Sequence, residues 1–278
     1  MARDKGKDKG KGQWGAEGAW AAAEDLVSST CADHLAMRRD GRESLVRNVA
    51  DEVLCDGWPR GTEGRIVEVG AEAVEASRDA IRTAGGLAEA RALDITDLAA
   101  TTAFIAETGP FDVLVNSAGL ARHSPALDTS PEDYDAAMNL NLRAAYFLTR
   151  EVARGLIAAG RGGSLINISS QMGHVAGPDR AVYAANKHAL EGMTKAMAIE
   201  WGPHGIRVNT LCPTFIRTPL AEQTLANPER KAWILSKIKL GRVGEVEDLM
   251  GPVVFLASDA SALMTGTHLI VDGGWTAE

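Results

Sequence analysis

Gly163-Ser-Leu-Ile-Asn-Ile168, with the helix and strand patterns after it, is the clearest evidence for the fold class. Its apolar run has the length of a buried strand and is bounded by turn residues. A helical pattern follows over Ala181–Trp201, and a second strand-like run, Arg207-Val-Asn-Thr-Leu211, comes next. Strand, helix and strand in succession indicate two parallel strands joined by a crossover helix.

The same alternation continues on both sides of this stretch. Strand-like runs occupy residues 65–69, 91–94, 111–115 and 267–271, and helical patterns occupy residues 72–84, 101–107, 131–159 and 245–258. The alternation predicts the α/β class, with a doubly wound parallel sheet covered on both faces, in one domain over residues 65–278. Ligands of such sheets bind beyond the carboxyl ends of the strands, so chemistry is expected just after Val115, Ile168 and Leu211.

Residues 1–64 have a different character and are expected to form an atypical segment. They contain no Phe or Tyr, and charged residues surround Trp14, Trp20 and Trp58. Residues 16–27 and 44–54 are compatible with helices. Residues 1–12 are rich in Lys, Gly and Asp and have no apolar core, so they indicate a flexible tail rather than a secretory signal.

The composition excludes several functional classes. A chain of 278 residues that is 45% hydrophobic can bury a sizeable core. Its formal net charge of -8 argues against a nucleic-acid partner, and no apolar run reaches the ~18 residues of a membrane span. Three scattered cysteines, Cys31, Cys55 and Cys212, favour a reducing, cytoplasmic setting. No metal site is expected, since His123 and His174 have no acid or cysteine at ligand spacing.

The strongest chemical signal is Ser170 followed by Tyr183-Ala-Ala-Asn-Lys187. Tyr183 and Lys187 lie four residues apart in a helical pattern and therefore share one face. A free tyrosine titrates near ~10, but a neighbouring ammonium group favours the phenolate, so the pair suits general acid–base catalysis. Ser170 follows a strand at the edge where ligands bind, and its hydroxyl can hold the same substrate oxygen.

From about residue 66 to residue 276 the chain resembles the short-chain dehydrogenase/reductase family. The motifs that carry this resemblance are Asn116-Ser-Ala-Gly119, Asn139-Leu-Asn141-Leu, Asn167-Ile-Ser-Ser170, the Tyr183–Lys187 motif, Arg207-Val-Asn-Thr-Leu-Cys-Pro213 and Val271-Asp-Gly-Gly274. Their order and spacing match the family, and the offset between Ser170 and Tyr183 is the usual one. The resemblance implies a Rossmann-like fold and an enzyme that interconverts a secondary alcohol and a ketone with NAD or NADP.

The resemblance also implies roles for individual residues. Tyr183 would be the proton donor or acceptor, Lys187 would assist it and bind the nicotinamide ribose, and Ser170 would orient the substrate oxygen. Asn141 would anchor a water that links Lys187 to solvent. The remaining cofactor contacts would come from Asp94, Asn116, Ala118, Gly119, Pro213, Ile216 and Thr218. Thr214 stands where the family usually has a glycine.

Polar residues near these motifs, namely Gln171, His174 and His123, are candidates for substrate contacts. They favour a polyol or sugar-acid substrate. A 3-oxoacyl-carrier-protein reductase is the alternative, and it would need a basic patch, for which only Arg122, Arg143 and Arg217 are available. The resemblance implies a homotetramer or homodimer that packs through the helices at 131–159 and 181–201.

The family's glycine-rich phosphate-binding turn is not recognisable. The nearest candidate, Val53-Leu-Cys-Asp-Gly57-Trp-Pro-Arg-Gly61-Thr-Glu-Gly64, is one residue too long and contains Pro59. Three hypotheses remain open: residues 1–64 are a frame-shifted reading, they bind the cofactor in another way, or the chain is a non-catalytic homologue that has lost cofactor binding. Resequencing the gene tests the first of them.

Overall fold

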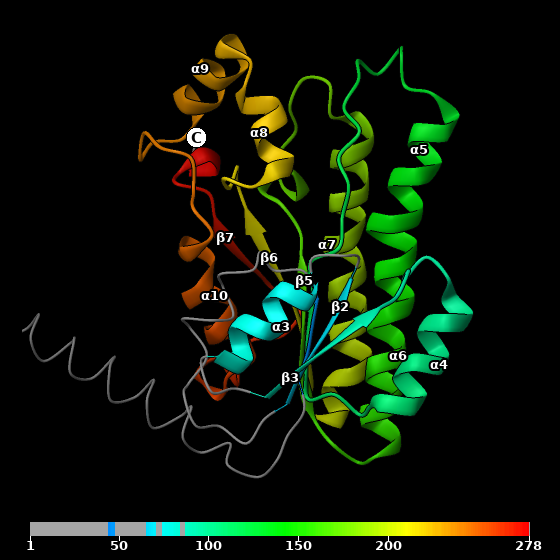
Figure 1. Cartoon of the computed structure of the whole chain (residues 1–278). Coiled ribbons are helices and arrows are strands. Elements are labelled where there is room, and N and C mark those ends of the chain that lie inside the picture. The colour runs from blue at the N-terminus through cyan, green and yellow to red at the C-terminus, as the bar shows by residue number, and fades with distance from the viewer. Residues whose placement is uncertain (1–43, 48–64, 71–73, 84–86, 278) are drawn as a thin grey trace, which may run out of the picture.

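A parallel β-sheet forms the centre of the molecule, with helices on both faces (Figure 1). The structure, a computed structural model, describes residues 44–47, 65–70, 74–83 and 87–277. Its strands lie in the order β3-β2-β1-β4-β5-β6-β7. Their bounds are β1 Ser44–Arg47, β2 Arg65–Gly70, β3 Leu87–Ala92, β4 Val113–Asn116, β5 Gly163–Ile168, β6 Ile206–Pro213 and β7 His268–Val271. The expected α/β class with a parallel sheet is confirmed.

The strand β1 corrects the expectation of a helix over residues 44–54, which is wrong for Ser44–Arg47. Leu45 pairs with Val67 of β2 on one side and with Leu114 of β4 on the other. Pairing on both sides gives hydrogen-bond partners to the backbone N–H and C=O groups of this strand. This stabilisation outweighs the weak helical pattern of such a short segment. The sheet therefore includes a strand from the N-terminal side of the expected boundary at residues 64 and 65. The candidate phosphate turn and residues 1–43 lie outside the described residues.

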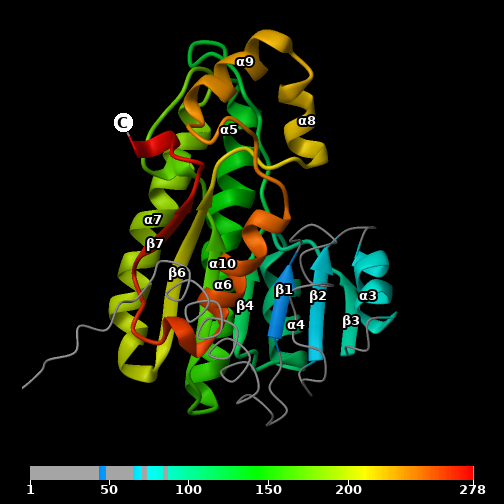
Figure 2. The same ribbon diagram turned by 90° about the vertical axis from the view of Figure 1, so that its left-hand side faces the viewer.

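Helices cover the two faces of the sheet unequally (Figures 1 and 2). One face carries α4 Leu98–Thr108, α5 Pro131–Met138, α6 Ala145–Ala158 and α7 Ala181–Trp201, and the other carries α3 Val74–Thr83 and α10 Glu247–Ala257. The helices α8 Pro219–Leu225 and α9 Pro228–Lys237 lie above the carboxyl ends of the central strands. The described helices are each too short or too polar to cross a membrane.

Alternating strand residues build two cores, one on each face. In β4, Leu114 packs into the cluster with Leu148 and Met197, whereas Val113 and Val115 pack into the cluster on the α10 side. Successive side chains of a strand point to opposite faces, so a strand buried on both sides must be apolar throughout. This explains the continuous apolar runs in the sequence.

Two expected elements differ from the structure at their ends or within them. The strand expected at residues 91–94 is placed too late, because β3 ends at Ala92 and Asp94 forms a turn in which its carboxylate accepts a hydrogen bond from the Thr96 amide (2.9 Å). The helix expected over residues 131–159 is interrupted by a π-helical segment, Asn139–Ala144, between α5 and α6. Such segments occur frequently at functional sites.

Candidate functional site

Ser170, Tyr183 and Lys187 come together at the carboxyl end of β5. The Lys187 ammonium is buried and donates to the carbonyl oxygen of Ile168, the last residue of β5 (2.9 Å). It also lies 5.7 Å from the centroid of the Tyr183 ring, one helical turn earlier in α7. Ser170 follows Ile168 by two residues, so one strand end and one helix face position all three side chains.

The Ser170 hydroxyl is held by its own loop. It donates to the side-chain oxygen of Gln171 (2.7 Å) and accepts from the Met172 amide (3.1 Å). Ser170 is thereby the N-cap of a short 3-10 helix, Gln171–Gly173. Gln171 is buried, with 2% of its surface exposed, and is the direct partner of Ser170. Its role as a substrate contact stays a prediction. The geometry shows that Gln171 orients the Ser170 hydroxyl.

Asn141 lies in the π-helical segment and grips the loop that follows β4. Its side-chain oxygen accepts from the Leu120 amide and its side-chain nitrogen donates to the Leu120 carbonyl, both at 2.8 Å. The Asn141 amide is 2% exposed and uses both ends in these bonds. That Asn141 anchors a water for Lys187 stays a prediction.

Asn116, Ala118 and Gly119 form the end of β4 and the turn after it. The Asn116 side-chain nitrogen donates to Asn167 of β5 (3.2 Å), while its oxygen is buried and has no hydrogen-bond partner among the described residues. A side chain at Gly119 would approach the Asn141 amide oxygen to 3.3 Å. The turn therefore keeps its backbone close to Asn141. The Asn116 side-chain oxygen remains a buried acceptor at the carboxyl end of β4.

Asp94 lies outside this centre, in the loop between β3 and α4. Its carboxylate bonds the amide and the hydroxyl of Thr96, both at 2.9 Å. The N-cap of α4 is the nearby Asp97, whose carboxylate accepts from the Ala99 and Ala100 amides. Contact between Asp94 and an adenine ring stays a prediction.

Pro213, Ile216 and Thr218 line the segment that leaves β6 towards α8. Pro213 pairs with Val271 of β7, Ile216 bridges to Gly244, and the Thr218 hydroxyl caps α8 by accepting from the Ala221 amide (3.3 Å). The segment is thus fixed at three points. Thr214, in the position of the family's glycine, has a hydroxyl that is buried and without a hydrogen-bond partner in the described residues.

A residue that the sequence reasoning missed, Arg180, stands beside His123 and Tyr183. It is 8% exposed, donates to His123 Nε2 (2.6 Å) and lies 5.0 Å above the Phe215 ring. Among the described residues no carboxylate forms an ion pair with Arg180, since its neighbour Asp179 pairs with Arg230 instead (3.1 Å). Burial lowers the pKa of Arg180 from its ordinary value. Arg180 precedes Tyr183 by three residues, and this spacing could have indicated from the sequence that the two side chains lie on the same side.

His123 packs edge-on against the Tyr183 ring, with 5.5 Å between the ring centroids. Burial first, and then the Arg180 charge, lower the pKa of His123 to about 4, so the ring is neutral near pH 7. A guanidinium only donates, so Nε2 accepts and the ring proton sits on Nδ1. That Nδ1 is buried and has no partner in the described residues. His123 therefore offers a donor beside Tyr183, and its role as a substrate contact stays a prediction.

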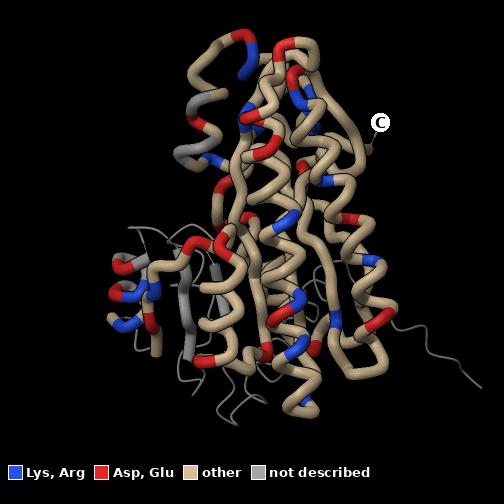
Figure 3. The backbone as a smooth tube through the Cα atoms, turned by 90° about the vertical axis from the view of Figure 1, so that its right-hand side faces the viewer, with Lys and Arg blue, Asp and Glu red and all other residues tan. Residues whose placement is uncertain are grey.

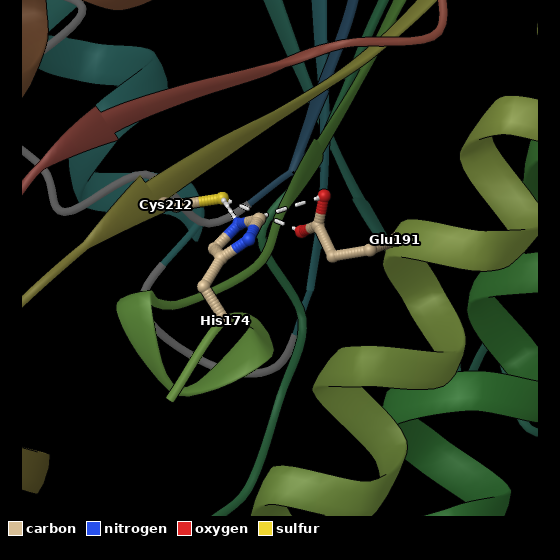
Figure 4. A group of neighbouring side chains, drawn as sticks. All are labelled: His174, Glu191 and Cys212. Carbon is tan, nitrogen blue, oxygen red and sulfur yellow. Dashed lines mark hydrogen bonds and ion pairs between the residues drawn. The ribbon is translucent and has the colours of Figure 1, made fainter. Parts of the chain in front are cut away.

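His174 has different surroundings from those that its sequence position suggests. It lies against Glu191 of α7 and Cys212 of β6 (Figure 4). Both burial and the cations nearby lower the pKa of His174, and Glu191 opposes them. The expectation that no acid or cysteine accompanies His174 is therefore wrong in three dimensions, because the fold joins residues that are far apart in the chain.

Two of the three basic residues named for the carrier-protein alternative are paired with acids. Arg122 pairs with Asp133 (2.6 Å), and Arg217 pairs with Glu222 (3.3 Å) and Glu245 (3.0 Å). Arg143 donates to the neutral side chain of Asn139 and lies over the Phe147 ring, so it keeps its net charge. A single unpaired arginine of these three is a small basic patch for docking an acidic carrier protein.

Comparisons with known proteins point to one group of enzymes. A family model described as enoyl-(acyl carrier protein) reductase matches residues 60–276. The chain is 37% identical to D-erythrulose reductase from Gallus gallus over 84% of this chain and 96% of that protein. It is 37% identical to gluconate 5-dehydrogenase from Gluconobacter oxydans, over 74% of this chain and 82% of that protein. A solved gluconate 5-dehydrogenase from Burkholderia cenocepacia, in complex with NADP and tartrate, is 33% identical with a TM-score of 0.80, covering 89% of this chain and 99% of that one.

Proposed function

The chain belongs to the short-chain dehydrogenase/reductase family of NAD(P)-dependent oxidoreductases, and we propose that its substrate is a sugar acid, in which it interconverts a secondary hydroxyl and a ketone. The relatives include reductases of neutral sugars and dehydrogenases of sugar acids. Choosing between these two classes requires a feature that recognises a carboxylate.

Arg180 is the observation that supports a sugar acid. A buried guanidinium without a carboxylate partner is unfavourable unless a ligand supplies the negative charge. A sugar-acid carboxylate fits a planar guanidinium through two parallel hydrogen bonds. The unpartnered Nδ1–H of His123 adds a donor for a hydroxyl of the same substrate. The related dehydrogenase whose structure contains tartrate supports the same chemistry, since tartrate is a hydroxy acid.

The residues present fit the nicotinamide half of the cofactor. Asn116 and Thr214, at the ends of β4 and β6, each have a buried oxygen that finds no hydrogen-bond partner in the part of the chain that the structure describes. Lys187 and the segment from Pro213 to Thr218 would hold the nicotinamide riboside. Bound NAD or NADP supplies the acceptor or donor of hydride. Asp94, Ala118 and Gly119 complete the proposed contacts.

The chain's own residues would manage the proton. Tyr183 takes the hydroxyl proton when an alcohol is oxidised and returns it to the carbonyl oxygen when a ketone is reduced. Lys187, fixed to the Ile168 carbonyl, keeps a positive charge beside the Tyr183 ring. Ser170, oriented by Gln171, holds the reacting oxygen. Asn141 keeps the turn after β4 in place through Leu120.

Two measurements test this function. The first titrates NADH and NADPH and follows nicotinamide fluorescence; binding of one of them supports an active enzyme, and binding of neither at millimolar concentration favours the non-catalytic homologue. The second compares turnover of D-gluconate with turnover of neutral sugars such as L-xylulose and D-erythrulose. A preference for the acid supports the proposal, whereas a preference for the neutral sugars refutes the role of Arg180. The pairing of Arg122 and Arg217 with acids disfavours the carrier-protein alternative.

The proposed assembly is a homodimer or homotetramer that packs through α5, α6 and α7. These helices form a groove whose lining is mostly apolar, and charges of both signs are scattered over this face (Figure 3). The groove residues are Asp135, Met138, Asn139, Leu142, Arg143, Tyr146, Phe147, Ala189, Met193, Ala196, Met197, Glu200 and Trp201. A second copy related by a two-fold axis would place Arg143 near Asp135 or Glu200 of its partner. It would also bury Tyr146, which is 42% exposed.

Light scattering tests the assembly. The wild type is expected to be a dimer or larger, and Tyr146→Glu is expected to shift it towards the monomer. A wild-type monomer would contradict the proposal. A cytoplasmic location is also proposed, and it is supported by the buried free thiol of Cys212.

A further inference from the structure

Three side chains from separate parts of the chain lie close together, on the same elements as the residues of the proposed active site. His174 directly follows the 3-10 helix after Ser170, Glu191 lies two turns beyond Tyr183 in α7, and Cys212 precedes Pro213 in β6 (Figure 4). Their potential ligand atoms all lie within 4.8 Å of one another. The proposed function of this protein uses none of the three.

We propose that His174, Glu191 and Cys212 bind a divalent transition-metal ion of the Zn²⁺ class. The imidazole nitrogen, the thiolate sulfur and the carboxylate oxygen are the three ligand types that zinc takes from proteins. A hard cation such as Mg²⁺ or Ca²⁺ prefers oxygen ligands and does not suit a site with sulfur and nitrogen.

The separations of the ligand atoms match those of a tetrahedral zinc site. With ordinary bond lengths, two neighbouring ligand atoms around tetrahedral zinc lie about 3.3–3.6 Å apart. The structure has 3.5 Å between His174 Nε2 and Cys212 Sγ, and 3.3 Å between Cys212 Sγ and Glu191 Oε1. His174 Nε2 lies 3.8 Å from Glu191 Oε2. The two Glu191 oxygens make the two separate contacts, so a single carboxylate oxygen can join both other ligands after a small rotation of the Glu191 side chain, within the 4.8 Å that spans the ligand atoms.

The charge of the site also suits a divalent cation. Glu191 is 6% exposed, and apart from its contact with His174 it is satisfied by neutral donors, the Thr210 hydroxyl (2.8 Å) and the Cys212 thiol. No Lys or Arg pairs with Glu191 in the described part of the chain. When the ion binds, its bonds to sulfur, nitrogen and oxygen form and the thiol proton leaves to solvent. The two negative ligands then balance the 2+ charge.

The surroundings leave a fourth position open. The His268 ring lies beside the His174 ring, with 4.2 Å between the centroids, on the exposed side of the group. Ser169, whose amide bonds the Leu211 carbonyl next to Cys212, has a buried hydroxyl beside the Cys212 thiol. Three protein ligands and a water that bonds to Ser169 would complete the coordination.

A bound ion would stabilise the active site, because its ligands come from the three elements that contain the active-site residues. The loop of Ser170, the helix of Tyr183 and Lys187, and the strand that leads to Pro213 would be joined by direct bonds. The expected consequence is a metal-dependent rise in thermal stability of the full chain.

Titration with Co²⁺ tests the site, since cobalt replaces zinc and a thiolate–cobalt bond absorbs in the near ultraviolet. The full chain with Cys31→Ser and Cys55→Ser is used, so that Cys212 is its remaining thiol. This variant, freed of metal, is expected to bind Co²⁺ with a sulfur-to-cobalt band and to melt at a higher temperature with Zn²⁺. Adding Cys212→Ala is expected to abolish the band, and His174→Gln to weaken binding by more than the ~10–100-fold typical of outer-shell changes.

The matched control is His188→Gln, which removes an exposed histidine from α7, the helix that contains Glu191. It is expected to leave the Co²⁺ titration unchanged. The proposal is overturned if the variant with Cys212 as its remaining thiol shows no sulfur-to-cobalt band, a result that does not require the ligand variants to fold. It is equally overturned if the band persists after Cys212→Ala.

Discussion

Arg180→Met removes the positive charge of the proposed carboxylate contact and keeps an unbranched apolar stem of similar volume. A net hydrogen bond to a charged group contributes about 1.5–3 kcal/mol. Arg180 is 8% exposed, so solvent screens it little and the upper part of this range applies. The value of kcat/KM for a sugar acid is therefore expected to fall by about 45- to 150-fold.

A neutral sugar has no carboxylate, and its kcat/KM is expected to change less than about threefold. The assay is the change in NAD(P)H absorbance with D-gluconate and with L-xylulose, measured on the same preparations. Thermal melting checks the fold, because Arg180 also bonds His123 and packs over Phe215. The informative quantity is the ratio of the two kcat/KM values, which a general loss of stability leaves unchanged.

Arg122→Met is the matched control. Arg122 is adjacent to His123 in sequence, but its side chain is 51% exposed and pairs with Asp133 on the surface, where such pairs contribute about 0–1 kcal/mol. Its ratio for acid over neutral sugar is expected to stay within about threefold of the wild type. An equal loss on both substrates in Arg180→Met, or no loss on the acid, would refute the reasoning.

Three further predictions concern the proton donor, the core and pH. Tyr183→Phe is expected to lower kcat by at least about 100-fold while NAD(P)H affinity stays nearly constant; an active variant would exclude Tyr183 as the acid–base. Leu114→Ala, fully buried in β4, is expected to lower the unfolding free energy by about 2–5 kcal/mol in thermal or urea melts, whereas Leu127→Ala, 99% exposed, is expected to change it little. The pKa of His123 is about 4 in the folded protein against an ordinary 6.5. The unfolded chain therefore takes up the proton first, and stability is expected to fall as pH drops from about 6.5 to about 4, by at most about 3 kcal/mol. His123→Gln should flatten that slope in urea melts, and an unchanged slope would contradict the assignment.

Local sequence patterns are enough to predict the α/β class and most strands of the sheet. Apolar runs such as residues 111–115 and 163–168 identify strands buried on both faces, because alternating side chains of one strand must fill both cores. The helix Ala181–Trp201 is found at the expected residues, since its pattern is long and periodic. The spacing of Tyr183 and Lys187 is local geometry, so a linear motif suffices to place them together.

Local patterns could not identify β1. Ser44–Arg47 is short, and its strand conformation depends on hydrogen bonds to β2 and β4, which lie far along the chain. The π-helical turn at Asn141 is another such case. Its side chain reaches the backbone of Leu120, and no helical period encodes that contact.

Which polar residues lie in contact depends on the three-dimensional fold. Arg180 is buried because Phe215 and His123 pack around it, and the absence of an acid partner among the described residues becomes visible only in space. His174, Glu191 and Cys212 are separated in the chain but converge where a loop, a helix and a strand touch. A sequence fixes which residues are one turn apart, whereas the assembly of sheet and helices sets the distances across the chain that give these charges and ligands their chemistry.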